Sequence, residues 1–200
     1  MAGFIDWRIV PTEYPNLWFK MTSHFADVHH AHCSRVNRNL TLMAEYYDTQ
    51  NMFDLSWQLT QRTIVHDQSK MQEPEYVPYV WRVYRTQWNN DPKKDERSLL
   101  KGCFDDPTLD QAIRDAVNHH ITHNRHHPEW HFDHDDMNKI DLTEMVCDWY
   151  AMSQEFKSSI DEWVAYVVPR RYHFGKRIPF IMTTVALLKD LDVSSRIRES

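Results

Sequence analysis

Apolar residues recur every three or four positions along most of the chain, which is the spacing of one face of an α-helix. No run alternates apolar and polar residues in the way that a half-buried strand does. We therefore expect an all-α bundle of about six or seven helices. The predicted helices cover approximately Thr22–Tyr47, Asp54–His66, Pro74–Tyr84, Pro107–Ile121, Asp141–Met152, Ile160–Val168 and Ile178–Leu191.

Several residues predict where these helices begin and which side faces the core. Asp106 and Ser159 each stand directly before a predicted helix and are good N-cap residues. Asp141, with Glu144 three residues later, has the spacing of a capping box. Near the end of the second helix, the apolar pair at 64–65 is expected to point inward.

Length and composition narrow the class of protein. A chain of 200 residues can bury a core without disulfides or structural metals, so we expect one domain over residues 1–200, with an irregular segment at 1–20 and a final helix from about 178 to 191. With 3 glycines, the chain has no Gly-rich phosphate loop. No long apolar run predicts a membrane span, and no signal peptide is evident, so we expect a cytoplasmic location.

The net charge of the chain limits the kinds of partner that it can bind. The net charge is -6, so the chain lacks the basic footprint of a protein that binds duplex nucleic acid. The three cysteines are far apart and are expected to be free thiols. Association into a homo-oligomer is left open by the sequence.

Histidines are concentrated in one stretch. Seven of the 13 histidines lie between residues 119 and 134. His119 and His123 share one helix face, and His120 shares the next with Asn124. Such a cluster favours a metal or substrate site, although a solvated histidine-rich face is the alternative.

An adjacent histidine and aspartate, His66 and Asp67, follow the apolar end of the second predicted helix. The two polar side chains can face an apolar core only if something pairs them. A divalent metal does so, because imidazole nitrogen and carboxylate oxygen are both good ligands.

Two further positions extend this pattern. His32 shares a helix face with Val36 and is expected to point inward, although His29 and His30 remain alternatives and a histidine bonded to a backbone carbonyl would look the same. Asp148 lies four residues after Glu144, and two carboxylates at that spacing repel each other without a cation. Either a metal resolves that repulsion, or Glu144 caps the helix and Asp148 pairs with an arginine.

The order of these residues resembles the HD superfamily of metal-dependent phosphohydrolases, which are α-helical bundles. Their signature is a helix histidine, a His-Asp pair and a later helix aspartate around a metal. Here the corresponding residues are His32, His66 with Asp67, and Asp148. The additional histidines resemble the branch of the superfamily that holds two metals.

The longer motifs are most similar to an uncharacterised bacterial and phage group within that superfamily. Its His-Asp-x-Ser-Lys motif matches residues 66–70, and its Glu-Tyr-x-x-Tyr motif matches residues 75–79. The His-x-x-x-Asn-x-His-His motif matches residues 120–127, and Glu-Met-x-x-Asp-Trp matches residues 144–149. The resemblance covers residues 32–149, which is more than half of the chain.

The resemblance implies a set of roles. One metal would be held by His32, His66, Asp67 and Asp148, and a second by His120 with His126 or His127, with Asp67 bridging the two. Beyond Asp67, the residues assigned to catalysis are Lys70 and Arg35, which could bind phosphate. Lys70, His123 and Asn124 are assigned to substrate binding, and Glu129 and Glu144 are expected to orient imidazole ligands. The donors do not distinguish manganese, cobalt, zinc, magnesium and iron.

The resemblance implies a hydrolase that cleaves a nucleotide or another small phosphoester with a metal-activated hydroxide. A small phosphorylated molecule is the expected partner, rather than duplex nucleic acid or a membrane. An HD-type di-iron oxygenase, like myo-inositol oxygenase, would use similar ligands. A third alternative is a metal-stabilised binding protein without turnover.

Overall fold

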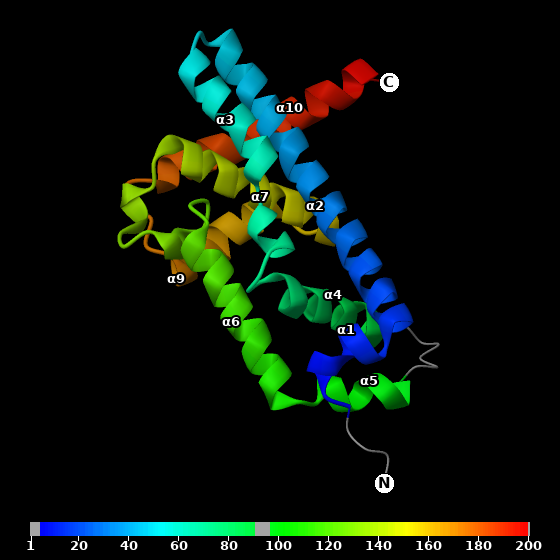
Figure 1. Cartoon of the computed structure of the whole chain (residues 1–200). Helices are drawn as coiled ribbons and strands as arrows, with labels where there is room; N and C mark the ends of the chain where they lie inside the picture. The colour runs from blue at the N-terminus through cyan, green and yellow to red at the C-terminus, as the bar shows by residue number, and fades with distance from the viewer. Residues whose placement is uncertain (1–4, 91–96, 200) are drawn as a thin grey trace. The chain divides into compact units, whose positions relative to one another are not determined.

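The computed structural model describes residues 5–90 and 97–199 (Figure 1). These residues form helices, turns and loops, with no strand among them, which confirms the predicted all-α bundle. Seven helices in the described ranges are eight residues or longer, in line with the expected number. They are α2 (Pro15–Thr49), α3 (Phe53–Val65), α4 (Tyr76–Asn90), α5 (Arg97–Phe104), α6 (Pro107–His123), α7 (Lys139–Phe156) and α10 (Ile178–Glu199).

Short helical turns connect the long helices. The 3-10 turns are η1 (Trp7–Ile9), η2 (Gln68–Met71), η3 (Pro128–Trp130) and η4 (His134–Asp136), and the short α-helices are α1 (Val10–Glu13), α8 (Ile160–Glu162) and α9 (Val168–Arg171). A π-helical turn, η5 (Trp163–Val167), joins α8 to α9. None of the described helices is long and apolar enough to cross a membrane.

The chain divides into two compact units. Unit 1 contains residues 1–30 and 68–120, and unit 2 contains residues 31–67 and 121–200. Helices α2 and α6 each supply residues to both units. The single domain predicted over residues 1–200 stays a prediction.

Unit 1 has an aromatic core. Trp81 of α4 is fully buried and meets Trp7 edge to face, with ring centroids 6.5 Å apart. The indole nitrogen of Trp7 donates a hydrogen bond to Thr108 over 3.0 Å, so the polar end of this aromatic is satisfied. Met21 and Phe25 of α2 belong to the same buried cluster.

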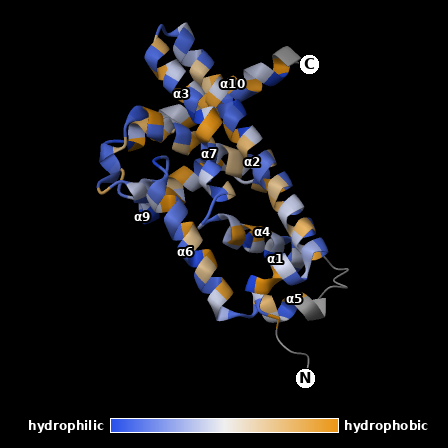
Figure 2. Cartoon of the chain, viewed as in Figure 1, coloured by the Kyte–Doolittle hydropathy of each residue, from blue (hydrophilic) through white to orange (hydrophobic). Residues whose placement is uncertain are grey.

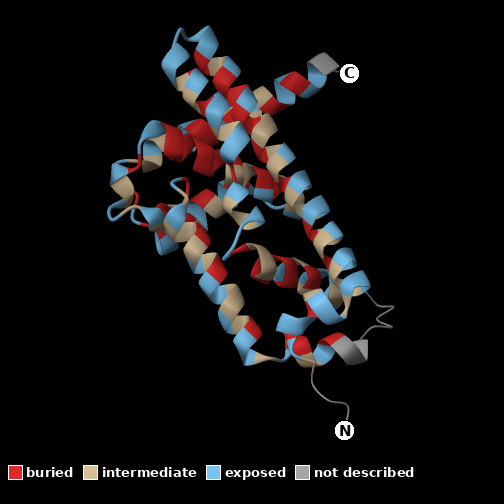
Figure 3. Ribbon diagram, in the orientation of Figure 1, coloured by how far each residue is buried: buried red, intermediate tan, exposed pale blue. Residues whose placement is uncertain are grey.

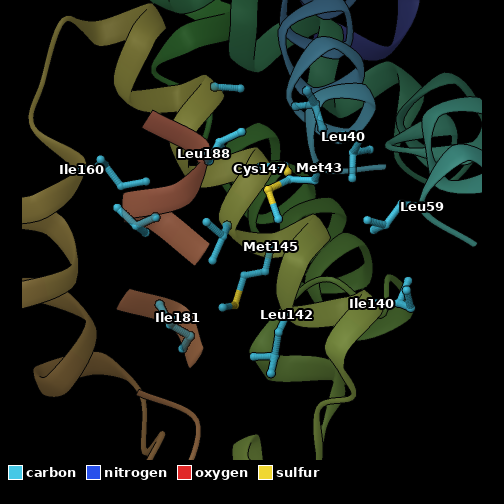
Figure 4. Close-up of a cluster of buried hydrophobic side chains, with 14 of the residues drawn as sticks. Leu40, Met43, Leu59, Ile140, Leu142, Met145, Cys147, Ile160, Ile181 and Leu188 are labelled. Atoms are coloured by element: carbon cyan, nitrogen blue, oxygen red, sulfur yellow. The ribbon is translucent and has the colours of Figure 1, made fainter. Parts of the chain in front are cut away.

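Unit 2 is built around α7. Residues 140–147 are all buried, so the first two turns of this helix are enclosed on every side (Figure 3). Apolar side chains from four other segments surround it (Figure 4). They include Leu40 and Met43 of α2, Leu59 of α3, Ile160 of α8, and Ile181 and Leu188 of α10. The acidic residues of α7 in this stretch are therefore buried as well, and each needs a polar partner.

The predicted caps are confirmed in two cases and wrong in one. Asp106 accepts a hydrogen bond from the Thr108 amide over 2.8 Å, and Ser159 accepts one from the Glu162 amide over 3.2 Å. The capping box at residues 141–144 does not form. Asn138 caps α7 instead, because the helix begins nearly one turn earlier than predicted. Residues 141 and 144 are therefore inside the helix, and both are buried.

The inward face of α3 also differs from the prediction. Ile64 and Val65 are 62% and 50% exposed, whereas Leu59 is fully buried. Hydrophobic and hydrophilic residues are interleaved along the helices (Figure 2). In α3 the inward face runs from Leu59 through Arg62 to His66, the residue that caps the end of the helix. Those positions are spaced by three and four residues, so the apolar pair falls on the other side.

Several helix boundaries in the structure differ from the predicted ones. Helix α2 begins at Pro15, so the irregular segment is shorter than the predicted 1–20, and residues 1–4 lie outside the described range. Helix α4 begins at Tyr76 rather than Pro74. Helix α10 continues to Glu199 instead of ending near residue 191.

Candidate metal centre

Unit 2 brings together six of the seven predicted metal ligands. Helix α2 supplies His32, the end of α3 supplies His66 with Asp67, the loop after α6 supplies His126 and His127, and α7 supplies Asp148. The seventh, His120, belongs to unit 1.

A turn at the end of α3 places Asp67. His66 ends the helix, and its amide still donates to the Arg62 carbonyl over 3.0 Å. Asp67 then adopts the left-handed conformation, with φ at 58°, which aspartate tolerates better than most residues. The turn directs the Asp67 carboxylate into the interior, where the residue is 1% exposed.

The Asp67 carboxylate faces three imidazole rings. Its Oδ2 atom lies 3.6 Å from Nε2 of His32 and 3.7 Å from Nε2 of His66. Its Oδ1 atom lies 3.6 Å from Nε2 of His126. The two oxygens of one carboxylate therefore face different histidines.

The first group of donors contains His32, His66 and Asp148, whose ligand atoms all lie within 4.8 Å of one another. Nε2 of His32 is 3.1 Å from Oδ1 of Asp148. The structure thereby selects His32 among the three neighbouring histidines. His30 is exposed, and His29 stacks on a phenylalanine of the unit 1 core.

The second group in unit 2 contains Asp67, His126 and His127, with ligand atoms again within 4.8 Å of one another. His126 is 3% exposed. Its ring lies 4.2 Å from that of His127 and 4.6 Å from that of His66, measured between centroids.

The protonation of these groups is uneven. Burial lowers the pKa of His66, but the carboxylates of Asp67, Glu144 and Asp148 outweigh it and raise that pKa to about 9. Burial and the charge of His66 instead hold the pKa of His126 well below its usual range. Although burial raises the pKa of Asp148, hydrogen bonding to His32 and the charge of His66 outweigh that effect and hold the pKa low.

His66 offers a test of whether the group accepts a metal. Nδ1 of His66 bonds to Oε1 of Glu144 over 3.0 Å. Nε2 of the same ring is buried and has no hydrogen-bond partner among the described residues. An imidazole held by a carboxylate at one nitrogen, with the other nitrogen facing further oxygen and nitrogen donors, is the usual environment of a metal-bound histidine. The residues therefore fit a divalent metal.

We expect metal binding to release about one proton from His66. In the metal-free protein this residue is protonated below about pH 9, and a nitrogen must lose its proton before it binds a metal. Apparent affinity should rise by about tenfold per pH unit from about pH 7 to about pH 9 and then level off. Titration calorimetry in two buffers of different ionisation enthalpy measures the proton, and equal heats in both buffers at neutral pH would contradict the expectation.

In unit 1, His120 is held by a buried glutamate. Glu75 is fully buried and bonds to Nδ1 of His119 over 2.7 Å and to Nδ1 of His120 over 3.0 Å. The Ser69 hydroxyl donates to Glu75 over 2.9 Å and also contacts Nδ1 of His120. Although burial raises the pKa of Glu75, these hydrogen bonds outweigh it and lower that pKa. The serine of the His-Asp-x-Ser-Lys motif thus has a structural partner.

The remaining predicted residues have varied surroundings. Lys70 lies in η2 of unit 1, with its ammonium 5.3 Å from the centre of the Tyr79 ring. In unit 2, His123 is exposed, and the carbonyl of Asn124 accepts from the His127 amide.

Two predicted residues have partners that the sequence did not indicate. Arg35 donates to Glu155 over 3.2 Å. Glu129, expected to orient an imidazole, instead accepts hydrogen bonds from Tyr172 and Arg171, because the C-terminal end of α9 places these donors beside it.

Sequence reasoning gave no role at the site to four residues around these groups: Arg62, Glu75, Asp141 and Glu155. Glu155 lies 3.8 Å from Nδ1 of His32, and Glu75 holds His120. Arg62 lies 3.4 Å from Glu144 and donates to Asp141 over 2.8 Å. One signal was available, because Arg62 precedes His66 by four residues and so shares its helix face.

Comparison with known proteins finds no match among curated proteins or solved structures. A family model does match, over residues 20–180. This range includes all of the residues described at the two groups of donors and at His120. Because the match spans well over half of the chain, the protein belongs to DUF5662, a family of unknown function.

Proposed function

We propose that this protein is a metal-dependent phosphohydrolase of the HD type, acting on a nucleotide or another small phosphoester. The observation that carries the proposal is the position of the Asp67 carboxylate. One of its oxygens faces His32 and His66, and the other faces His126. A carboxylate that faces two sets of donors in this way suits a bridging ligand between two metals.

His32, His66, Asp67 and Asp148 would hold the first metal, and Asp67 with His126 and His127 would contribute to the second. The participation of His120 in the second site stays a prediction. When bound, two divalent ions supply an activated hydroxide and neutralise charge on the phosphoryl oxygens.

The protein's own residues would balance the charge of the metals, orient a histidine ligand and bind the phosphate. Asp148 and Asp67 supply negative charge that balances the metals, and Glu144 fixes the ring of His66 through its Nδ1 atom. Arg35, one turn after His32 on α2, and Lys70 are the cations proposed to bind phosphate oxygens. The net charge of -6 disfavours long nucleic acids and leaves small phosphoesters as substrates.

The test begins with protein purified without chelator. Its metal content is measured, and release of inorganic phosphate is followed for a panel of nucleoside mono-, di- and triphosphates and small phosphomonoesters. We expect turnover that chelation abolishes and added manganese restores. Two bound irons with a visible absorption band, together with oxygen uptake and no phosphate release, would refute the hydrolase and identify the protein as an oxygenase. Full metal occupancy without either reaction would indicate a binding protein.

Lys70→Ala should keep its metals but lose substrate. A charge-assisted hydrogen bond contributes roughly 1.5–3 kcal/mol, so we expect kcat/KM to fall by about tenfold or more. Steady-state kinetics on the best substrate measures the change. Lys101→Ala is the matched control, because Lys101 is an exposed lysine of the same unit. Unchanged kcat/KM in Lys70→Ala would remove this residue from the substrate site.

A further inference from the structure

One carboxylate in unit 2 touches a histidine from each group of donors. Oε1 of Glu144 bonds to Nδ1 of His66 over 3.0 Å and lies 3.5 Å from Nδ1 of His126. Glu144 is 1% exposed, so this arrangement is shielded from water. The same two rings direct their Nε2 atoms to opposite oxygens of Asp67.

These contacts fix the roles of the ring nitrogens. A carboxylate only accepts hydrogen bonds, so contact with Glu144 favours the proton on Nδ1 of each ring. The Nε2 lone pair of each ring then faces the Asp67 side, where a metal would bind. Both rings thus present Nδ1 to the same oxygen atom of Glu144.

A chain of charged groups links Glu144 to Asp141 through Arg62. Nε of Arg62 lies 3.4 Å from Oε2 of Glu144, and Nη2 of Arg62 donates to Asp141 over 2.8 Å. Asp141 is fully buried and also accepts hydrogen bonds from Arg125 and Asn138, each over 2.9 Å. Buried carboxylates of this kind are costly unless they are paired, so the arginine compensates both of them.

The period of α7 aligns these groups. Asp141, Glu144 and Asp148 are spaced by three and four residues, so they lie on one face of the helix. Along that face, Asp141 binds Arg62, Glu144 faces His66 and His126, and Asp148 is a donor of the first group. One helix therefore carries both a donor of the first group and the carboxylate that faces a histidine of each group.

We propose that Glu144 is a positioning residue shared by both metal sites and that Arg62, anchored by Asp141, holds it in place. This inference rests on the proposed two-metal function. It assigns Glu144 a role in the second site as well as the first, so loss of its charge should weaken both metals together.

The test compares metal binding in the full chain and in Glu144→Gln. Manganese and zinc are titrated separately into metal-free protein, and both affinity and number of ions are measured. We expect both sites to weaken by about 10- to 100-fold, as for other residues that orient metal-bound histidines. NMR of the imidazole nitrogens in the zinc-loaded protein, where each ring bound through Nε2 keeps one proton, should show a weaker hydrogen bond at Nδ1 of both rings in Glu144→Gln.

Glu155→Gln is the matched control, because Glu155 lies beside His32 of the first group only. That variant should weaken one site at most. Arg62→Lys keeps the charge and should weaken both sites less than Glu144→Gln does.

Weakening of a single site in Glu144→Gln, or unchanged affinity at both, would overturn the inference while leaving the hydrolase intact. A parent chain that binds fewer than two ions would overturn it as well. Two ions without phosphate release would instead refute the proposed function and leave the shared role of Glu144 to be decided by the affinities.

Discussion

Asp67→Asn should leave the protein folded but without bound metal and without detectable phosphate release. Asparagine keeps the size of the side chain but removes the negative charge that faces His32, His66 and His126. Both proposed metals use that carboxylate, so both lose a ligand at once. Metal content after dialysis measures occupancy, and circular dichroism measures the retained helicity.

A matched control separates the loss of this ligand from the loss of any surface charge. Asp190→Asn makes the same chemical change at an exposed position of α10 in the same unit, and we expect it to retain both metals and full activity. If Asp67→Asn kept full metal occupancy, Asp67 would not be a ligand, and the proposal that it bridges two metals would be refuted.

His126→Ala should leave about one metal per chain and reduce the rate severely. His126 belongs to the second group, where its Nε2 atom faces Asp67, whereas His32, His66 and Asp148 of the first group remain in place. One metal alone stabilises the developing phosphoryl charge less well than two. The ratio of metal to protein, measured beside the parent chain, gives the result.

His30→Ala is the control for this variant, because His30 is exposed and should change neither occupancy nor rate. His120→Ala extends the test to unit 1. A loss of one metal in His120→Ala would support the predicted place of His120 in the second site. A parent with a single metal would contradict the two-metal proposal and leave the cluster of histidines to substrate binding.

Helical periodicity predicted much of the fold. The long helices were expected from apolar residues three and four positions apart, and the caps at Asp106 and Ser159 follow from local chemistry. These features depend on residues close together in the chain. Where a local rule failed, burial explains the failure: Asp141 and Glu144 have the spacing of a capping box, but α7 lies inside the core and their carboxylates bond to side chains from other segments.

The sequence by itself determined the all-α class, most helix positions and the residue types from which a metal centre could be built. The tertiary structure decided which residues meet. It selected His32 over His29 and His30, turned Ile64 and Val65 outward, gave Glu129 other partners and brought Arg62 to Glu144. The physical reason is that a periodic pattern fixes the faces of a helix, whereas the partner of a buried charge depends on which distant segment packs against that face.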